Sequence, residues 1–226
     1  MFETAYREQE RLVARLVSAG DRVRGWKIGA TSGAVRARLK TSEPFYAVLL
    51  QSNFLPGEAV VPGAGWAEVL VECEIAFVLE RHLEGPGVTP RAVRERVAEV
   101  RPAFDVIGLV HGGPPEGAAD VIRSNGSCAG VVLGATGLPV SQCDPAEVEV
   151  VLRGEGCVMA RGAGAEVMGD PCAAVAWLAN RLAQSHQRIL AGQVVLSGSM
   201  AAATAVASDA LEADFGRLGR VTLRVE

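Results

Sequence analysis

Apolar residues surround two carboxylates in residues 69–79, a pattern that predicts a strand with acidic groups in its middle. The segment is rich in Val, Leu, Ile and Phe and contains neither Gly nor Pro. Side chains alternate along a strand, so Glu72 and Glu74 share one face while Val71 and Cys73 point to the other. Two like charges on an apolar strand repel each other and resist desolvation, and a divalent cation would offset both costs. The alternative is an exposed strand face that carries two solvated acids.

A second predicted strand, residues 102–110, is apolar except for Asp105. A third acid on a buried strand strengthens the metal hypothesis, because three oxygen donors suit Mg²⁺ or Mn²⁺ better than zinc. Lys27 lies between apolar neighbours in a third short strand at residues 25–29. A lysine there either extends its ammonium group to solvent or is placed for chemistry.

The remaining pattern predicts a single β-rich α+β domain over residues 1–226, with helices around it. A helical segment spans residues 3–19 and ends at Gly20. Thr89 and Pro90 predict the start of a helix over residues 89–100, and Asp170 predicts the start of another over 171–184. A short helix at 33–40, a strand at 44–50 and two hairpins at 148–161 and 210–225 complete the prediction.

Composition excludes several classes of function. The net charge of −4, without a basic run, and the low aromatic content of 5% argue against a nucleic-acid partner. No apolar run is long enough to span a membrane, and the charged N-terminus is not a secretory signal. Five cysteines without a CxxC pair indicate reduced, mostly buried thiols in a cytoplasmic protein.

A polar turn precedes the predicted strand that ends near residue 133. Asn125 and Ser127 in this turn could orient a substrate, or they could cap their own backbone turn. The sequence leaves both interpretations open.

Several motifs in fixed order resemble the fumarylacetoacetate hydrolase superfamily, and within it the branch of 2-oxopent-4-enoate hydratases and 4-oxalocrotonate decarboxylases. The resemblance covers roughly residues 4–226. Its motifs are Gly-Trp-Lys-Ile-Gly at 25–29 with Thr-Ser at 31–32, Glu-x-Glu at 72–74, Pro-Ala-Phe-Asp at 102–105, Asn-Gly-Ser at 125–127, the segment 168–180, and Ala-Gly-x-Val-Val-Leu-Ser-Gly-Ser at 191–199.

The resemblance implies a mixed β-sandwich roll with peripheral helices. It implies that Glu72, Glu74 and Asp105 hold Mg²⁺ or Mn²⁺, that the ion chelates a short unsaturated 2-oxo acid, and that Lys27 is the catalytic residue beside the substrate. By the same resemblance, substrate-binding positions fall on Phe45, Asn125, Ser127 and Ser199. It further implies a homo-oligomer, with a possible complex with an enzyme of the same pathway.

Three positions depart from the family pattern. Phe45 stands where hydratases usually carry an acid, Val110 where an arginine often follows the third metal acid, and Ser124 where an aspartate usually precedes the asparagine. The first change removes a candidate acid or base, and the second removes a cation for the substrate carboxylate. Arg123 could replace that cation, or it could be a solvated loop arginine.

The main functional hypothesis is a metal-dependent lyase of the hydratase type, and a decarboxylase is the first alternative. A C–C bond hydrolase of the acylpyruvate type would need a base to activate water, and none of His82, His111 and His186 lies in a matching family motif. A non-catalytic partner subunit is the last alternative. Members of the family usually have additional residues before the first helix, so either this member is shorter there or its start lies upstream.

Overall fold

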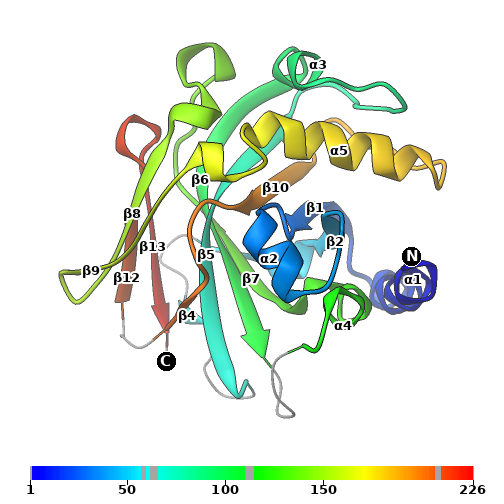
Figure 1. Cartoon of the computed structure of the whole chain (residues 1–226), viewed down its shortest axis with the longest axis horizontal. Coiled ribbons are helices and arrows are strands. Elements are labelled where there is room, and N and C mark those ends of the chain that lie inside the picture. The colour runs from blue at the N-terminus through cyan, green and yellow to red at the C-terminus, as the bar shows by residue number, and fades with distance from the viewer. Residues whose placement is uncertain (1, 57–59, 62–65, 110–114, 207–209, 226) are drawn as a thin grey trace.

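The computed structural model describes residues 2–56, 60–61, 66–109, 115–206 and 210–225. Two β-sheets form the body of the molecule, and helices lie around them (Figure 1). The predicted α+β, β-rich class is therefore confirmed. The helices are α1 (Glu3–Ser18), α2 (Gly33–Arg38), α3 (Pro90–Arg94), α4 (Ala118–Arg123) and α5 (Pro171–Ala183).

Helix ends follow the capping residues in the sequence. Asp170 accepts a hydrogen bond from the backbone N–H of Cys172 at 2.8 Å, which begins α5. Gly20 adopts a φ of +105° directly after the end of α1, a conformation that glycine adopts readily.

The helix predicted over residues 89–100 is wrong in its second half. Thr89 caps α3 as expected, but the helix ends at Arg94 and β6 (Val97–Leu109) begins three residues later. Val97 and Val100 are buried because β6 pairs along almost its whole length with β5 (Glu68–Leu79). This long pairing outweighs the local helical pattern.

The larger sheet runs in the order β2-β1-β10-β5-β6-β7-β3, with β11 beside β5. Its other strands are β1 (Val23–Gly29), β2 (Phe45–Leu50), β3 (Phe54–Leu55), β7 (Cys128–Leu133), β10 (Val194–Ser199) and β11 (Thr204–Ala205). The smaller sheet runs in the order β4-β13-β12-β8-β9. Its strands are β4 (Val60–Val61), β8 (Glu149–Gly154), β9 (Cys157–Ala163), β12 (Ala210–Asp214) and β13 (Arg220–Val225). Both predicted hairpins are confirmed.

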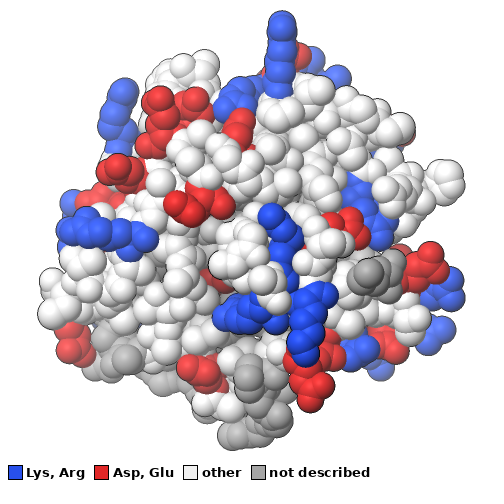
Figure 2. Space-filling model, viewed as in Figure 1, with Lys and Arg blue, Asp and Glu red and all other residues white. Residues whose placement is uncertain are grey.

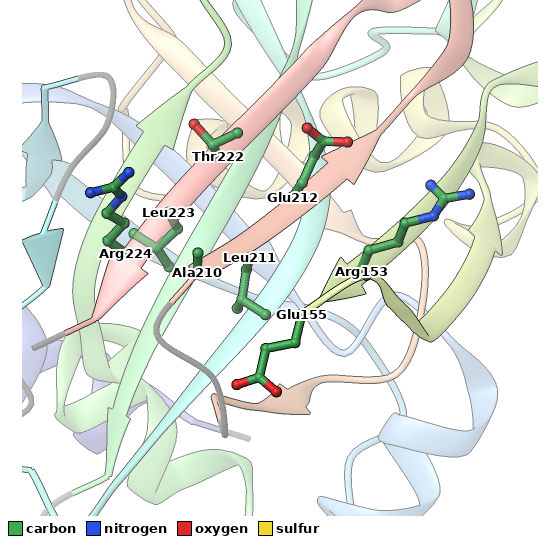
Figure 3. Close-up of a pocket in the computed structure, with 9 residues that line it drawn as sticks. Arg153, Glu155, Ala210, Leu211, Glu212, Thr222, Leu223 and Arg224 are labelled. Carbon is green, nitrogen blue, oxygen red and sulfur yellow. The ribbon is translucent and has the colours of Figure 1, made fainter.

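A surface hollow lies on the smaller sheet, where acidic, basic and apolar side chains of β8, β12 and β13 meet (Figure 3). It contains none of the site residues predicted from the sequence. Its lining comprises Arg153, Glu155, Gly156, Ala210, Leu211, Glu212, Thr222, Leu223 and Arg224.

The larger sheet curls into a roll. β2 leads through a short 3₁₀ turn (Gln51–Asn53) into β3, which pairs with β7 at the far end of the strand order. The side-chain amide of Asn125 completes this closure, because it donates to the carbonyl of Val48 and accepts from the Val48 N–H, both at 2.8 Å. The turn before β7 is thereby fixed to β2.

Side chains on the two faces of the roll enter separate apolar clusters. The outer face joins the main core, to which β5 contributes Val71, Cys73 and Ile75. The inner face holds a small cluster of buried residues: Leu49, Ala76, Ala103, Val131, Val194 and Leu196. Because Ala76 and Ala103 lie two positions from Glu74 and Asp105 on their strands, both acids share the inner face with this cluster.

No helix within the described ranges is both long and apolar enough to cross a membrane. All five cysteines are free: Cys73 and Cys172 are buried, Cys128 and Cys143 are half-buried, and Cys157 is exposed. Two of the five thiols are therefore buried as expected, and the other three are partly or fully exposed.

We predict that Asn125→Ala lowers the free energy of unfolding by about 2 to 4 kcal/mol. The change leaves the N–H and C=O of Val48 without their partner, and it places alanine at a φ of +53°. Urea unfolding followed by circular dichroism measures the effect. Gln142→Ala, at an exposed position, serves as the control. An Asn125→Ala protein with the wild-type midpoint would show that this amide does not secure the roll.

Candidate metal centre

Three acidic side chains meet on the inner face of the roll. Glu72 on β5 lies directly opposite Asp105 on β6, and Glu74 lies two residues further along β5. One carboxylate oxygen from each residue lies within 4.8 Å of the others. Glu74 and Asp105 are buried, with 1% and 0% of their surface exposed, while Glu72 is half-buried. The structure thus brings the three predicted metal ligands together.

The protonation of this cluster reflects the cost of burying like charges. Burial, followed by the charge of Asp105, raises the pKa of Glu72 to about 7. Burial also raises the pKa of Glu74 well above its ordinary value, with the charges of Asp105 and Glu72 adding to the effect. A divalent cation would favour the ionised form of all three groups.

The donor set fits a hard cation. All three side chains offer oxygen, and the buried carboxylate of Asp105 has the Lys27 ammonium group as its charged partner. One ammonium group cannot balance three clustered carboxylates, so a cation would still lower the cost of ionising all three. Carboxylate oxygens without nitrogen or sulfur donors suit Mg²⁺ or Mn²⁺.

A bulge in β10 positions Glu74. The register between β10 and β5 shifts between Leu196 and Ser199, and the N–H of Gly198 donates to Oε2 of Glu74 at 2.6 Å. Gly198 has a φ of +112°, and a Cβ built on it would lie 2.5 Å from the Thr31 side chain. Only glycine meets both conditions without strain. Sequence reasoning missed this role, although a glycine inside a predicted strand is a signal for a bulge.

Lys27 extends from β1 across the inside of the roll. Only 4% of its surface is exposed, its ammonium group forms an ion pair with Asp105, and it donates to the carbonyl of Gly126 at 3.1 Å. Burial alone would lower the pKa of Lys27, but the neighbouring carboxylates, Asp105 foremost, hold that pKa above its ordinary value. Lys27 is therefore positively charged at neutral pH.

Phe45 is the first residue of β2, which pairs with the strand that carries Lys27. It pairs with Gly29 across β1 and β2, two positions along the strand from Lys27. A Cβ on Gly29 would lie 2.3 Å from the Phe45 ring. The position that departs from the family pattern thus carries an apolar ring that packs on Gly29 and joins the main core.

The polar residues that were predicted to bind substrate all form hydrogen bonds within the protein. Both polar groups of the Asn125 side chain bond to Val48, so this amide holds β2. The hydroxyl groups of Ser127 and Ser124 share a hydrogen bond of 3.0 Å. Ser199 pairs with Glu74 across the strands, and its hydroxyl donates to the carbonyl of Ala201 at 2.6 Å.

Arg123 is engaged away from the acidic cluster. It forms ion pairs with Glu8 on α1, at 3.0 Å, and with Asp120 on its own helix. Its hypothetical role as a replacement cation for substrate is therefore not supported. Val110 lies outside the described residues.

Arg38 was not singled out by the sequence. It lies at the end of α2, and its positive charge counters the rise in the pKa of Glu72. No sequence signal identifies it, because only the packing of α2 against the roll brings it near this acid.

Comparison with known proteins finds similarity to the fumarylacetoacetate hydrolase family over nearly the whole chain. A family model described as fumarylacetoacetate (FAA) hydrolase C-terminal matches residues 14–226. The 2-oxo-hept-4-ene-1,7-dioate hydratase of Escherichia coli is 32% identical over 229 residues, which cover 98% of this chain and 86% of that protein. The 4-oxalocrotonate decarboxylase of Pseudomonas sp. (strain CF600) is 32% identical over 206 residues, covering 91% and 78%.

A solved structure also aligns along the full chain. The 4-oxalocrotonate decarboxylase from Pseudomonas putida G7, complexed with magnesium and adipate, superposes with a TM-score of 0.96 at 30% identity. The alignment covers 100% of this chain and 86% of that one. The roll and its decorating helices are thus shared with a metal-binding relative.

We predict that Glu74→Gln lowers the affinity for Mn²⁺ at least about tenfold, because one of three charged ligands is lost. Isothermal titration calorimetry measures the change. Glu68→Gln, an exposed position at the start of the same strand, is the matched control and keeps wild-type affinity. If Glu74→Gln binds Mn²⁺ as tightly as this control, the metal assignment is wrong.

Proposed function

Because the chain belongs to the fumarylacetoacetate hydrolase family, we propose that it is a divalent-metal-dependent lyase acting on a short unsaturated 2-oxo acid, a 2-hydroxydienoate or its tautomer, as a hydratase. The observation that carries the proposal is the buried cluster of Glu72, Glu74 and Asp105 with the Lys27 ammonium group beside it. The hydratases among the relatives support the choice of reaction.

Glu72, Glu74 and Asp105 are the residues that would hold Mg²⁺ or Mn²⁺. A divalent ion, when bound, supplies positive charge that polarises the 2-oxo group and stabilises an enolate. The Gly198 N–H keeps one oxygen of Glu74 in a fixed direction, so the ligand set is preorganised.

Lys27 is suited to donate a proton. Its ammonium form is favoured by Asp105, and the Gly126 carbonyl fixes its position. A proton delivered to the carbon skeleton completes either the tautomerisation or the addition step of a hydratase. The positive charge also offsets part of the negative charge that an anionic substrate adds.

Decarboxylation is the second candidate, and Phe45 favours it. Hydration requires a group that activates water, whereas loss of CO₂ requires only an electron sink and a proton donor. Phe45, whose ring packs on Gly29, stands at the position where the family pattern places an acid. A decarboxylase is also among the structural relatives.

A C–C bond hydrolase would need a base such as histidine, and neither histidine among the described residues lies at the acidic cluster. Nδ1 of His82 accepts a hydrogen bond from the Ala191 N–H on the surface, and His186 lies exposed after α5. His111 lies outside the described residues. Neither described histidine belongs to the group of acids around Asp105.

The oligomeric state of the protein and its location in the cell stay predictions. We expect residues 1–226 to act as one catalytic domain in a cytoplasmic homo-oligomer, with a possible complex with an enzyme of the same pathway. Size-exclusion chromatography with light scattering measures the oligomer, and a single-chain mass would contradict that expectation.

We predict that Lys27→Ala lowers turnover at least about a hundredfold while Mn²⁺ affinity changes little, because Lys27 contributes a proton and not a metal ligand. Turnover is followed by ultraviolet absorbance, and affinity by calorimetry. Wild-type turnover in Lys27→Ala would remove this residue from the mechanism.

One assay separates the two reactions. A 2-hydroxydienoate that carries a carboxyl group able to leave as CO₂ is incubated with the Mg²⁺-loaded protein, and absorbance and CO₂ are recorded together. We expect absorbance to decay without CO₂ release. Decay with equal CO₂ release identifies the decarboxylase, and a constant absorbance contradicts both lyase candidates.

A further inference from the structure

A pocket with a volume of about 490 Å³ lies between α1, the C-terminal end of α5 and the start of β2. This α1–α5 pocket is lined by the carboxylates of Glu3, Glu10 and Glu43 and by the guanidinium groups of Arg7 and Arg181, among other groups. Figure 2 shows side chains of both charges where α1 and the end of α5 lie in the view of Figure 1. The volume is in the range of sites that bind small molecules.

Two stacked tyrosines contribute to this lining. The ring centroids of Tyr6 and Tyr46 are 4.5 Å apart, and Cζ of Arg181 lies over the Tyr6 ring, 5.4 Å from its centroid. The Tyr6 hydroxyl is engaged within the fold, because it accepts a hydrogen bond from the Tyr46 N–H at 3.3 Å. Both faces of Tyr6 are thus covered, and its hydroxyl has a partner.

The hydroxyl of Tyr46 is available to a ligand. Only 5% of this residue is exposed, and its hydrogen bonds with described residues use its backbone, as in the bond that its carbonyl accepts from Gln9. Burial raises the pKa of Tyr46, so the hydroxyl stays protonated at neutral pH and can donate. A buried hydroxyl without a partner, on the lining of a pocket, is a group that a ligand can satisfy.

Three charged side chains of the pocket form no ion pair within the described part of the chain: Glu10, Glu43 and Arg181. Glu43 and Arg181 are half-buried, where an unpaired charge is less stable than in water. Arg7, in contrast, pairs with Glu3 at 3.5 Å. A ligand that pairs with the remaining charges must therefore carry both signs.

The carboxylates of the pocket do not gather as metal ligands do. The described residues contain one group of three such side chains within 4.8 Å of one another, and it is the acidic cluster. Separate carboxylates suit an organic ligand whose cationic groups lie apart. The lining contains three acids and two arginines, a net charge of −1, which favours a ligand with net positive charge.

We infer that the α1–α5 pocket binds a basic α-amino acid such as L-lysine. Its carboxylate lies at the Arg181 guanidinium group and the Tyr46 hydroxyl, which are suitable donors. Its two ammonium groups lie at the carboxylates of Glu10 and Glu43. This ligand supplies a partner of opposite sign to each unpaired charge of the pocket.

The α1–α5 pocket is separate from the acidic cluster, so the inference goes beyond the proposed function. The Tyr46 side chain belongs to the main core. Ala47, the next residue on β2, lies opposite Lys27 on β1. Because successive side chains of a strand point to opposite faces, Tyr46 points away from the inside of the roll.

Three probes with related carbon chains test the inference. L-lysine has one carboxylate and two ammonium groups, L-norleucine lacks the side-chain ammonium group, and cadaverine lacks the carboxylate. Calorimetry on the Mg²⁺-loaded protein measures each affinity. We expect L-lysine to bind at least about fivefold more tightly than either of the other two. Equal affinities for the three probes, or no measurable binding of L-lysine, would overturn the inference.

Tyr46→Phe separates binding from packing. It removes only a hydroxyl that has no partner among the described residues, so the urea unfolding midpoint stays unchanged while the affinity for L-lysine falls at least about threefold. Arg181→Gln lowers the affinity for L-lysine at least about fivefold and leaves that for cadaverine unchanged. Arg15→Gln, an exposed change of equal charge on α1, keeps the wild-type affinity. Wild-type affinity for L-lysine in Tyr46→Phe or in Arg181→Gln contradicts the inference.

Glu74→Gln distinguishes the pocket from the metal centre, because amino acids also chelate metal ions. We expect this variant to bind L-lysine like the wild type. Loss of L-lysine binding in Glu74→Gln, with binding retained in Arg181→Gln, would place the ligand at the metal centre and overturn the inference. Failure of the proposed function appears instead as absent turnover of an unsaturated 2-oxo acid, which none of these binding measurements reports.

Discussion

The ion pair between Lys27 and Asp105 connects β1 and β6, two strands of the roll that do not pair with each other. Both side chains are almost fully buried, so neither charge is stable there without the other. The pair exists only because the sheet curls far enough for opposite parts of its inner face to meet. Closure of the roll is therefore also the condition for the chemistry proposed at its centre.

β5 divides its residues between packing and chemistry. Val71, Cys73 and Ile75 anchor the strand in the main core, while Glu72 and Glu74 project into the roll. Burial of the apolar face stabilises the strand. Burial of the carboxylates on the other face is unfavourable, and a bound cation would offset that cost. Between Val71 and Ile75, residues therefore alternate between the core and the acidic cluster.

The parity of β5 was predictable from sequence because it depends on one strand alone. That Asp105 lies opposite Glu72 follows from the register between β5 and β6, which local pattern does not specify. The same pairing explains the error at residues 89–100, where a helical pattern gave way to β6. The placement of Arg38 and the engagement of Asn125 depend on contacts between distant segments, and such contacts leave no periodic signal in the sequence.

The turn at residues 125–127 combines two tasks in adjacent groups. The Asn125 side chain joins the turn to β2, and the Gly126 carbonyl holds the Lys27 ammonium group. The same three residues thus serve the closure of the roll and the position of the lysine beside the acidic cluster. Substitutions in this turn are consequently constrained twice in evolution, because they would disturb the fold and the reactive centre together.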